Sequence, residues 1–165
     1  MSRSIVASAA VAVAATVSFA APAVAKDEVV KVAHPAVTAS LAPVTPGQAS
    51  AGDIRTYWTP LTKPGKTKSI GFMTGYLLTT ALNKPETGKE LRTADLVFTI
   101  GAAENQLEIG GVAAYDGQAP TVAQKTSVIR PVVGGSGRYA GAHGWAKSIH
   151  LKDGTWRHIF HIHLP

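Results

Sequence analysis

A cluster of glycines between two β-rich runs constrains this chain more than any other feature of its sequence. The segment reads Val133-Gly134-Gly135-Ser136-Gly137-Arg138-Tyr139-Ala140-Gly141-Ala142-His143-Gly144. Glycine adopts positive φ angles readily, so chains use it where a strand turns sharply. The pattern therefore predicts a tight corner between two strands, in which residues 138–140 make about one helical turn.

The same glycines satisfy a loose nucleotide-binding pattern, but their context excludes that function. Residues 135–140 match G-x-G-x-x-A, a spacing that dinucleotide-binding folds use where a strand leads into a helix. No amphipathic helix follows here, because residues 143–164 have the pattern of two strands. The Gly-Lys-Ser/Thr ending of a phosphate-binding loop is also absent from the sequence.

From Gly52 onward the chain has the pattern of short strands separated by turns. Apolar residues nowhere recur at helical spacing over several turns, and β-rich runs end at turn residues such as Lys63-Pro64-Gly65-Lys66 and Asp116-Gly117. The predicted strands are 53–60, 69–81, 90–101, 105–115, 124–134, 143–152 and 155–164. This number and spacing of strands are typical of an antiparallel barrel or sandwich.

The glycine corner, the Asp153-Gly154 turn and the aromatic last strand together resemble the dirigent and allene-oxide-cyclase-like superfamily, in particular its small secreted bacterial members. The resemblance covers roughly residues 52–165, and the C-terminal third carries its specific motifs. It implies an all-β fold with one antiparallel eight-stranded barrel, so a further short strand or a split of strand 69–81 is expected. Plant dirigent proteins end this corner in Ala-Arg-Gly-Tyr with a pocket arginine, where this chain has His143.

The first 25 residues have the pattern of a secretory signal peptide. An apolar run from Ile5 to Ala21 follows Arg3, and Ala23-Val24-Ala25 matches a cleavage site. The run is interrupted by Ser and Thr and is short for a membrane helix, which needs about 20 apolar residues. The mature protein is therefore predicted to be secreted and to lack a membrane span.

Residues 26–51 are rich in Ala, Val, Thr and Pro, and their prolines interrupt any helix. They are predicted to form a flexible segment that the barrel does not need, or one that is partly extended along it. The barrel domain is then predicted to comprise residues 52–165.

Charge and cysteine content exclude several classes of function. The chain has no cysteine, which excludes disulfides, a thiolate nucleophile and cysteine metal ligands. Its net charge is +6, but the basic residues are scattered, a pattern that argues against nucleic-acid binding. His161 and His163 lie on one side of a predicted strand, yet no third ligand is evident, so no metal is predicted.

The last hairpin decides which side chains face the lumen. If Asp153 and Gly154 are the two central residues of its turn, Ala146 pairs with His161, and alternation sorts the hairpin into two faces. The aromatic face includes His143, Trp145, Trp156, His158 and Phe160. The other face includes the small residues Gly144, Ala146 and Ser148. The resemblance implies that the aromatic face looks inward, whereas the sequence alone leaves the opposite parity open, because a slip of one residue reverses the faces.

An aromatic face inside a small barrel predicts a pocket for one flat apolar or phenolic ligand. His143 and His158 are the predicted catalytic groups, because a neutral imidazole can move a proton or bind a carbonyl. Trp145, Trp156 and Phe160 are predicted to form the walls. As alternatives, His143 could be a corner residue bonded to backbone carbonyls, and His158 a hydrogen-bonded core residue.

Three further residues are candidates for substrate binding. Tyr76 could donate a hydrogen bond from its phenol. Arg130, which precedes Pro131, could contact an anion or pair with Glu108. Glu108 is destabilising in a barrel interior unless it is paired, and the favoured alternative is that it faces solvent.

The resemblance implies a cofactor-independent protein that guides the cyclisation or stereoselective coupling of an apolar or phenolic intermediate, as a cyclase or isomerase. Catalysis of that kind depends on positioning and on exclusion of water. The alternative is a non-catalytic carrier that uses the same pocket. The resemblance also implies a homotrimer formed through the outside of the barrel, where Gly144, Ala146 and Ser148 would permit close approach.

Overall fold

The computed structural model describes residues 25–83 and 88–165, so the predicted signal peptide lies outside the described residues except for Ala25. Within them the chain forms strands and one short 3-10 helix. The elements are β1 (Lys26–His34), β2 (Ser40–Ala42), β3 (Ile54–Thr62), β4 (Ser69–Leu82), β5 (Lys89–Ile100), β6 (Gln106–Ile109), β7 (Val112–Asp116), β8 (Thr126–Ser136), η1 (Gly137–Tyr139), β9 (His143–His150) and β10 (Trp156–Leu164). None of the described residues belongs to a helix of the length and apolarity that crossing a bilayer requires.

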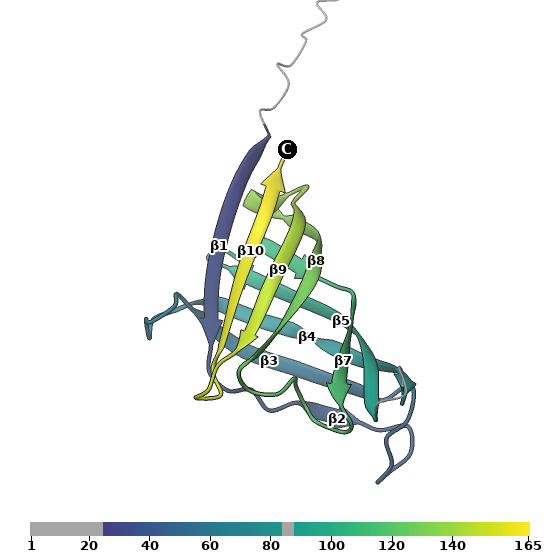
Figure 1. Ribbon diagram of the computed structural model, residues 1–165. Coiled ribbons are helices and arrows are strands. Elements are labelled where there is room, and N and C mark those ends of the chain that lie inside the picture. The colour runs from purple at the N-terminus through teal and green to yellow at the C-terminus, as the bar shows by residue number, and fades with distance from the viewer. Residues whose placement is uncertain (1–24, 84–87) are drawn as a thin grey trace, which may run out of the picture.

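The strands close into an antiparallel barrel of eight strands, when β6 and β7, which both pair with β5, are counted as one interrupted strand. The order around the barrel is β1-β10-β9-β8-β6-β5-β4-β3, and the pair Ala33 and Thr62 joins β1 back to β3. In Figure 1, β1, β10, β9 and β8 run steeply across β3, β4 and β5, which lie behind them. The predicted all-β eight-stranded barrel is confirmed.

The strands predicted from residue 52 onward correspond to β3, β4, β5, β6 with β7, β8, β9 and β10. The predicted strand 105–115 is interrupted at Gly110-Gly111, where Gly111 has a φ of 90°. The predicted corner is also confirmed, since η1 joins β8 to β9. At Gly137, with a φ of 59°, a Cβ atom would lie 2.4 Å from the Asn105 side-chain oxygen, so only glycine fits.

The structure corrects the prediction that the barrel begins at residue 52 and does not need residues 26–51, although part of this segment does lie extended along the barrel, as was considered. β1 pairs with β10 along its whole length, from Lys26 opposite Leu164 to His34 opposite Trp156. Val32 and His34 are buried. β1 is therefore the eighth strand of the barrel. Its three valines favour a strand, but the Ala- and Pro-rich residues that follow obscured this signal.

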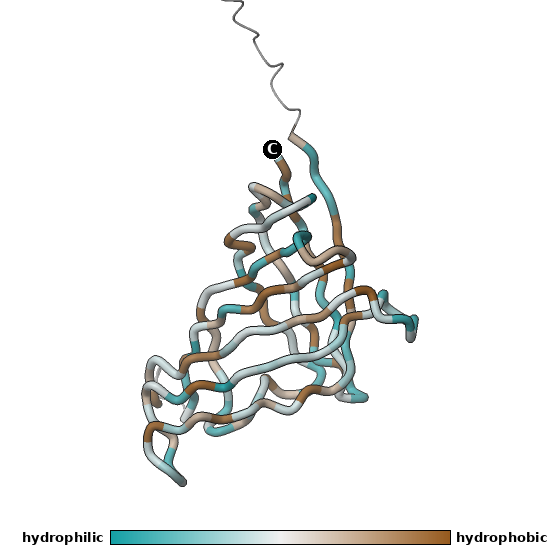
Figure 2. The backbone as a smooth tube through the Cα atoms, turned by 180° about the vertical axis from the view of Figure 1, so that it is seen from behind, coloured by the Kyte–Doolittle hydropathy of each residue, from teal (hydrophilic) through white to brown (hydrophobic). Residues whose placement is uncertain are grey.

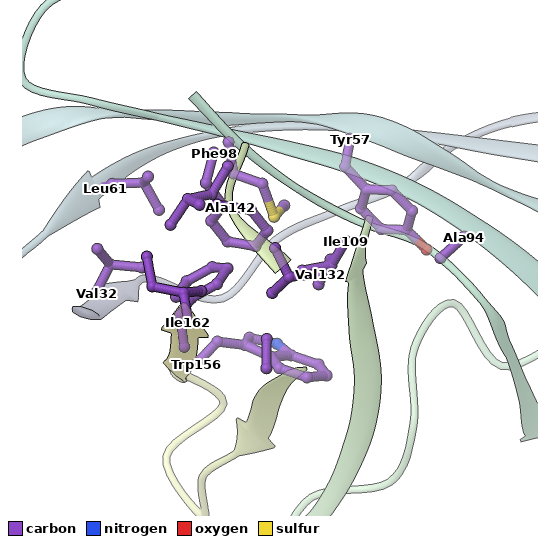
Figure 3. Packing of buried hydrophobic residues seen from close by; sticks show 14 of the residues in the cluster. Val32, Tyr57, Leu61, Ala94, Phe98, Ile109, Val132, Ala142, Trp156 and Ile162 are labelled. Atoms are coloured by element: carbon purple, nitrogen blue, oxygen red, sulfur yellow. The ribbon is translucent and has the colours of Figure 1, made fainter. Parts of the chain in front are cut away.

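Inward side chains fill the end of the barrel at which β10 ends. Val32, Leu61, Phe98 and Ile162 come from opposite walls and point toward one another (Figure 3). Phe98 meets Phe160 edge to face, with ring centroids 5.0 Å apart. Hydrophobic and hydrophilic residues alternate along much of the chain, as Figure 2 shows. A pocket lies toward the other end, where β10 begins.

The position of β1 generates a test by truncation. A chain that begins at Gly52 lacks β1, so it leaves an edge of β10 unpaired and loses the burial of Val32 and His34. We expect this chain to show no cooperative thermal unfolding, because the barrel cannot close. A chain that begins at Lys26 is the control and is expected to unfold in one transition, followed by circular dichroism. Equal melting temperatures for the two chains would show that β1 is dispensable.

Candidate functional site

The turn between β9 and β10 decides which side chains reach the barrel interior. The Gly154 N–H donates to the Leu151 carbonyl at 3.1 Å, and the Leu151 N–H donates to the Thr155 carbonyl at 2.9 Å. Gly154 has a φ of 83°. These hydrogen bonds and the left-handed glycine define a three-residue hairpin loop. Ala146 therefore pairs with Phe160 and not with His161, so the predicted register is wrong by one residue.

This shift separates the side chains that were predicted to share one face. Trp156, His158 and Phe160 of β10 point inward, as the predicted parity required. On β9 the inward residues opposite them are His150, Ser148 and Ala146. The extra loop residue shifts the pairing of β9 with β10 by one residue. Because side chains alternate between the two faces, this shift turns the opposite set of β9 side chains inward. Gly144, Ala146 and Ser148 thus do not lie on the outer surface, and that basis for close subunit contact is removed.

His143 and Trp145 lie on the outer surface, so their predicted place in the pocket is wrong for the same reason. The His143 Nδ1 atom lies 3.4 Å from the Gly141 carbonyl oxygen, which is the corner position considered as an alternative. Trp145 is 42% exposed and stacks on His161, with ring centroids 4.0 Å apart.

The other candidates divide between the two sides of the barrel wall. Tyr76 is 38% exposed, and Glu108 lies on β6 between the buried Leu107 and Ile109, facing away from them. Arg130 points inward and is buried, so it does not pair with Glu108. Phe160 packs in the core on Phe98, beyond the pocket.

A pocket opens into the barrel near the start of β10. Its wall is mostly apolar and includes Met73, Leu77, Leu96 and Val128. Val37 and residues 121–122, which lie in segments between strands, complete the lining and are called the cover below. The free volume is about 50 Å³. That is room for a few water molecules, at about 10–15 Å³ each. A ligand with an aromatic ring therefore requires the cover to open.

His158 is the most deeply buried titratable group at this pocket. Its Nδ1 atom lies 2.8 Å from the Ser148 hydroxyl oxygen, and its Nε2 atom has no hydrogen-bond partner among the described residues. Burial lowers the pKa of His158 well below its ordinary value, and the nearby His34 acts in the same direction. The imidazole is therefore neutral at pH 7 and has one free ring nitrogen in the barrel interior.

Aromatic rings stack around His158. Trp156 stacks on His150 with ring centroids 4.4 Å apart, and His34 lies 5.1 Å from His158. The His34 Nδ1–H donates to the Pro35 carbonyl at 2.7 Å. Burial lowers the pKa of His34, and this outweighs the opposing effect of the Pro35 carbonyl. His34 and His158 therefore contribute uncharged rings to this stack at neutral pH.

A buried carboxylate compensates two buried cations beside the pocket. Glu90 accepts hydrogen bonds from the Arg92 guanidinium at 2.7 and 3.0 Å, and Arg55 lies 3.7 Å from it. The Gln118 backbone N–H donates to Glu90 at 2.6 Å. Burial raises the pKa of Glu90, but the Gln118 N–H and Arg92 outweigh it, so the pKa lies below its ordinary value. The carboxylate stays ionised near neutral pH.

Side chains around the pocket hold the loop 117–125, which carries part of the cover. The Arg92 guanidinium donates to the Ala119 carbonyl at 2.6 Å, and the Tyr57 hydroxyl donates to the Pro120 carbonyl at 2.6 Å. Burial raises the pKa of Tyr57 to about 12, so its phenol remains a donor. The His150 Nδ1–H donates to the Val122 carbonyl at 2.7 Å. The cover is therefore attached to the barrel through side chains that surround the pocket.

Arg130 is a third buried guanidinium, and it lines the pocket. It donates to the Gly111 carbonyl at 2.9 Å and to the Tyr115 hydroxyl at 2.5 Å. Among the described residues it makes no ion pair with a carboxylate. Arg130 thus differs from Arg55 and Arg92, which share Glu90.

No metal site is evident in the part of the chain that the structure describes. His161 and His163 lie on the outer face of β10, where His163 contacts Asp27. Residues 25–83 and 88–165 contain no group of three or more His, Asp or Glu side chains that could hold a metal ion.

Sequence analysis missed Ser148, Tyr115 and the charged network around Glu90. A signal did exist, because Arg55 and Tyr57 share one parity in β3 with the buried Leu61. The opposite parity of β3 contains Ile54 and Trp58, which are equally apolar. Alternation alone therefore could not show which side of this strand faces inward.

The charged network predicts the effect of neutralising Glu90. Glu90→Gln leaves two buried guanidinium groups without their anion, so we expect it to lower the free energy of unfolding by about 3–5 kcal/mol. The matched control is Asp116→Asn, which removes the exposed ion pair with Lys89 and is expected to change stability by less than about 1 kcal/mol. Urea denaturation measures both changes. Equal small effects would mean that Glu90 does not stabilise the barrel.

Comparisons with known proteins show the fold. No protein-family model and no curated protein sequence matches the chain. Among solved structures, a pyocyanin demethylase matches with a TM-score of 0.63 at 12% identity, over 82% of this chain and 99% of that one. The Diels–Alderase AbmU from Streptomyces koyangensis matches with a TM-score of 0.62 at 16% identity, over 87% of this chain and 71% of that one. The pterocarpan synthase dirigent protein GePTS1 matches with a TM-score of 0.58 at 16% identity, over 86% of each chain. The chain therefore has the dirigent and allene-oxide-cyclase-like barrel fold that its C-terminal motifs predicted.

Proposed function

We propose that this protein binds an apolar or phenolic small molecule inside the barrel and guides its cyclisation or stereoselective coupling, without a cofactor. The observation that carries the proposal is the His158 Nε2 atom, buried at an apolar pocket and without a partner among the described residues. Proteins rarely leave a buried polar atom unpaired, and exceptions often mark functional sites. A ligand oxygen is the partner that this nitrogen lacks. The names of two similar structures, a Diels–Alderase and a dirigent protein, are consistent with the proposal.

His158 can orient a ligand through either of its tautomers. If the Ser148 hydroxyl donates to Nδ1, then Nε2 carries the proton and donates to a ligand carbonyl or phenol oxygen. If Nδ1–H donates to Ser148, then Nε2 accepts a proton from a ligand hydroxyl. In both cases the hydrogen bond fixes one end of the ligand, while Trp156 and the rings stacked on it hold its flat body.

Catalysis here would depend on geometry more than on strong acid or base groups. Holding the reacting carbons of a flexible ligand in one arrangement lowers the entropy that the reaction must lose. The cover, Val37 with residues 121–122, must open to admit a ligand, because the free volume is about 50 Å³. Its closure over the ligand would exclude water from reactive intermediates.

A carrier without turnover is the competing function. It is favoured because the surface of the pocket is mostly apolar and because Ser148 is the one hydrogen-bond partner of the His158 ring among the described residues. A carrier and a cyclase would share the binding site and differ only in whether His158 affects the reaction rate.

Binding of the fluorescent phenol 2-naphthol tests the site. Trp156→Ala removes one wall of the pocket and is expected to weaken binding by about 1–3 kcal/mol. Trp145→Ala is the matched control, and it is expected to leave binding unchanged because Trp145 lies on the outer face. Equal affinities for both variants and the wild type would show that 2-naphthol does not occupy the pocket.

Turnover then separates the two functions. With a polyene or phenolic substrate found by screening, His158→Gln should lower kcat more than it weakens binding in a cyclase. In a carrier, wild type and His158→Gln would yield the same product distribution, and only affinity would differ.

The proposal includes export and assembly as a homotrimer. Cleavage after Ala23-Val24-Ala25 would make Lys26, the first residue of β1, the mature N-terminus. The outer face of β1, β9 and β8 exposes Val29, Trp145, Ile129 and Val133, an apolar surface that a second copy could cover. Native mass spectrometry of protein recovered from the culture medium should show chains that begin at Lys26 and the mass of a trimer. A monomer at micromolar concentration, or an unprocessed chain, would contradict these parts of the proposal.

A further inference from the structure

The buried groups beside the pocket contain more positive than negative charge. Three guanidinium groups, those of Arg55, Arg92 and Arg130, are buried together with the carboxylates of Glu90 and Asp53. Glu90 compensates Arg92 and Arg55, and Asp53 accepts hydrogen bonds from the Val44 and Ser50 backbone N–H groups. Arg130 is 3% exposed, and its partners in the described residues are a carbonyl and a phenol, both uncharged.

A buried guanidinium has no means of losing its charge. The guanidinium group is too weak an acid to release its proton in proteins, unlike a lysine, which burial can neutralise. Isolation of such a cation from water is strongly unfavourable unless an anion lies opposite. The charge at Arg130 therefore calls for an anion that the described chain does not supply.

The donors at this position also select the type of anion. Arg130 has five N–H donors in a planar fork, and two of them are used by the Gly111 carbonyl and the Tyr115 hydroxyl. Because Tyr115 accepts from Arg130, its own hydroxyl proton remains available to donate. Both Arg130 and Tyr115 line the pocket. A fork of N–H groups beside a phenol suits a planar, acceptor-only group such as a carboxylate, which can bind guanidinium through two oxygens.

We infer that the pocket takes an apolar ligand with a carboxylate head group, that Arg130 binds this head group, and that the apolar body extends toward Trp156 and His158. The inference rests on the proposed function, because it assigns the substrate class of the same pocket. Arg130 lies on β8 opposite Ala146, and His158 lies on β10 opposite Ser148. Their strands are separated by β9, which places the two backbones about 10 Å apart. One ring system can span this distance.

A pair of matched ligands tests the inference in the wild-type protein. 2-Naphthoate and 2-naphthamide have the same shape, but only 2-naphthoate carries a charge at pH 7. We expect 2-naphthoate to bind at least about tenfold more tightly, the scale of a charge-assisted hydrogen bond in a buried site. Equal affinities would overturn the inference. Trp156→Ala would still weaken both ligands in that case, and the proposed function would stand.

Three variants locate the preference. Arg130→Met removes the charge and keeps the length, and it should abolish the preference for 2-naphthoate. Arg130→Lys keeps the charge without the planar fork and should retain part of the preference. Lys147→Met is the matched control, because it changes the net charge equally from the outer face of β9, and it should keep the full preference. A preference that persists in Arg130→Met would overturn the inference.

Two further outcomes separate the remaining explanations. If neither ligand is weakened by Trp156→Ala, the ligands bind elsewhere and the proposed function fails together with the inference. If chloride raises the melting temperature of the wild type but not of Arg130→Met, and 2-naphthoate is not preferred, the anion is an inorganic ion and the inference is overturned. The wild-type comparison of 2-naphthoate with 2-naphthamide stays decisive even if Arg130→Met does not fold.

Discussion

The buried carboxylate of Glu90 connects the wall, the charge and the cover of the pocket. It binds Arg92 on its own strand β5 and lies near Arg55 on β3, so it connects two strands of the barrel wall that flank β4. It also accepts the Gln118 N–H from the loop that covers the pocket. A buried ion pair is stable only when its geometry and hydrogen bonds are complete. The positions of β3, β5 and the loop 117–125 therefore depend on one another through the Glu90 side chain.

The two ends of the barrel have different roles. At one end, Phe98, Phe160 and Ile162 fill the interior with apolar side chains. Since the chain has no cysteine, this packing and the strand ladder provide the stability that disulfides would otherwise add. At the other end, the His158 Nε2 atom and the charge of Arg130 lack partners within the described chain. The apolar end offsets the unfavourable burial of those groups, because its packing stabilises the barrel as a whole.

The barrel fold alone does not identify the reaction. Similar structures carry the names of a demethylase, a Diels–Alderase and a dirigent protein, and folds that host several chemistries do so through different side chains on the same scaffold. In this chain the corner histidine, His143, lies outside the barrel, where plant dirigent proteins have their pocket arginine inside. The arginine that this chain does place in its pocket is Arg130, on the preceding strand. The function therefore has to be argued from His158, Arg130 and Tyr115.

The sequence by itself determined the all-β class, the strands from residue 52 onward, the glycine corner and the shared face of Trp156, His158 and Phe160. These features follow from local rules, since glycine sets corners and alternation assigns side chains to two faces. Only the tertiary structure decided which face is buried. Asp153-Gly154 suits either a two-residue turn or the three-residue loop that forms. The one additional loop residue puts His143 and Trp145 on the outside and Ser148 in the pocket. The barrel closes because β1 pairs with both β10 and β3, which are far from it or separated from it in sequence. The Ala- and Pro-rich context of β1 gives a weak strand signal, and its hydrogen bonds to those two strands stabilise it.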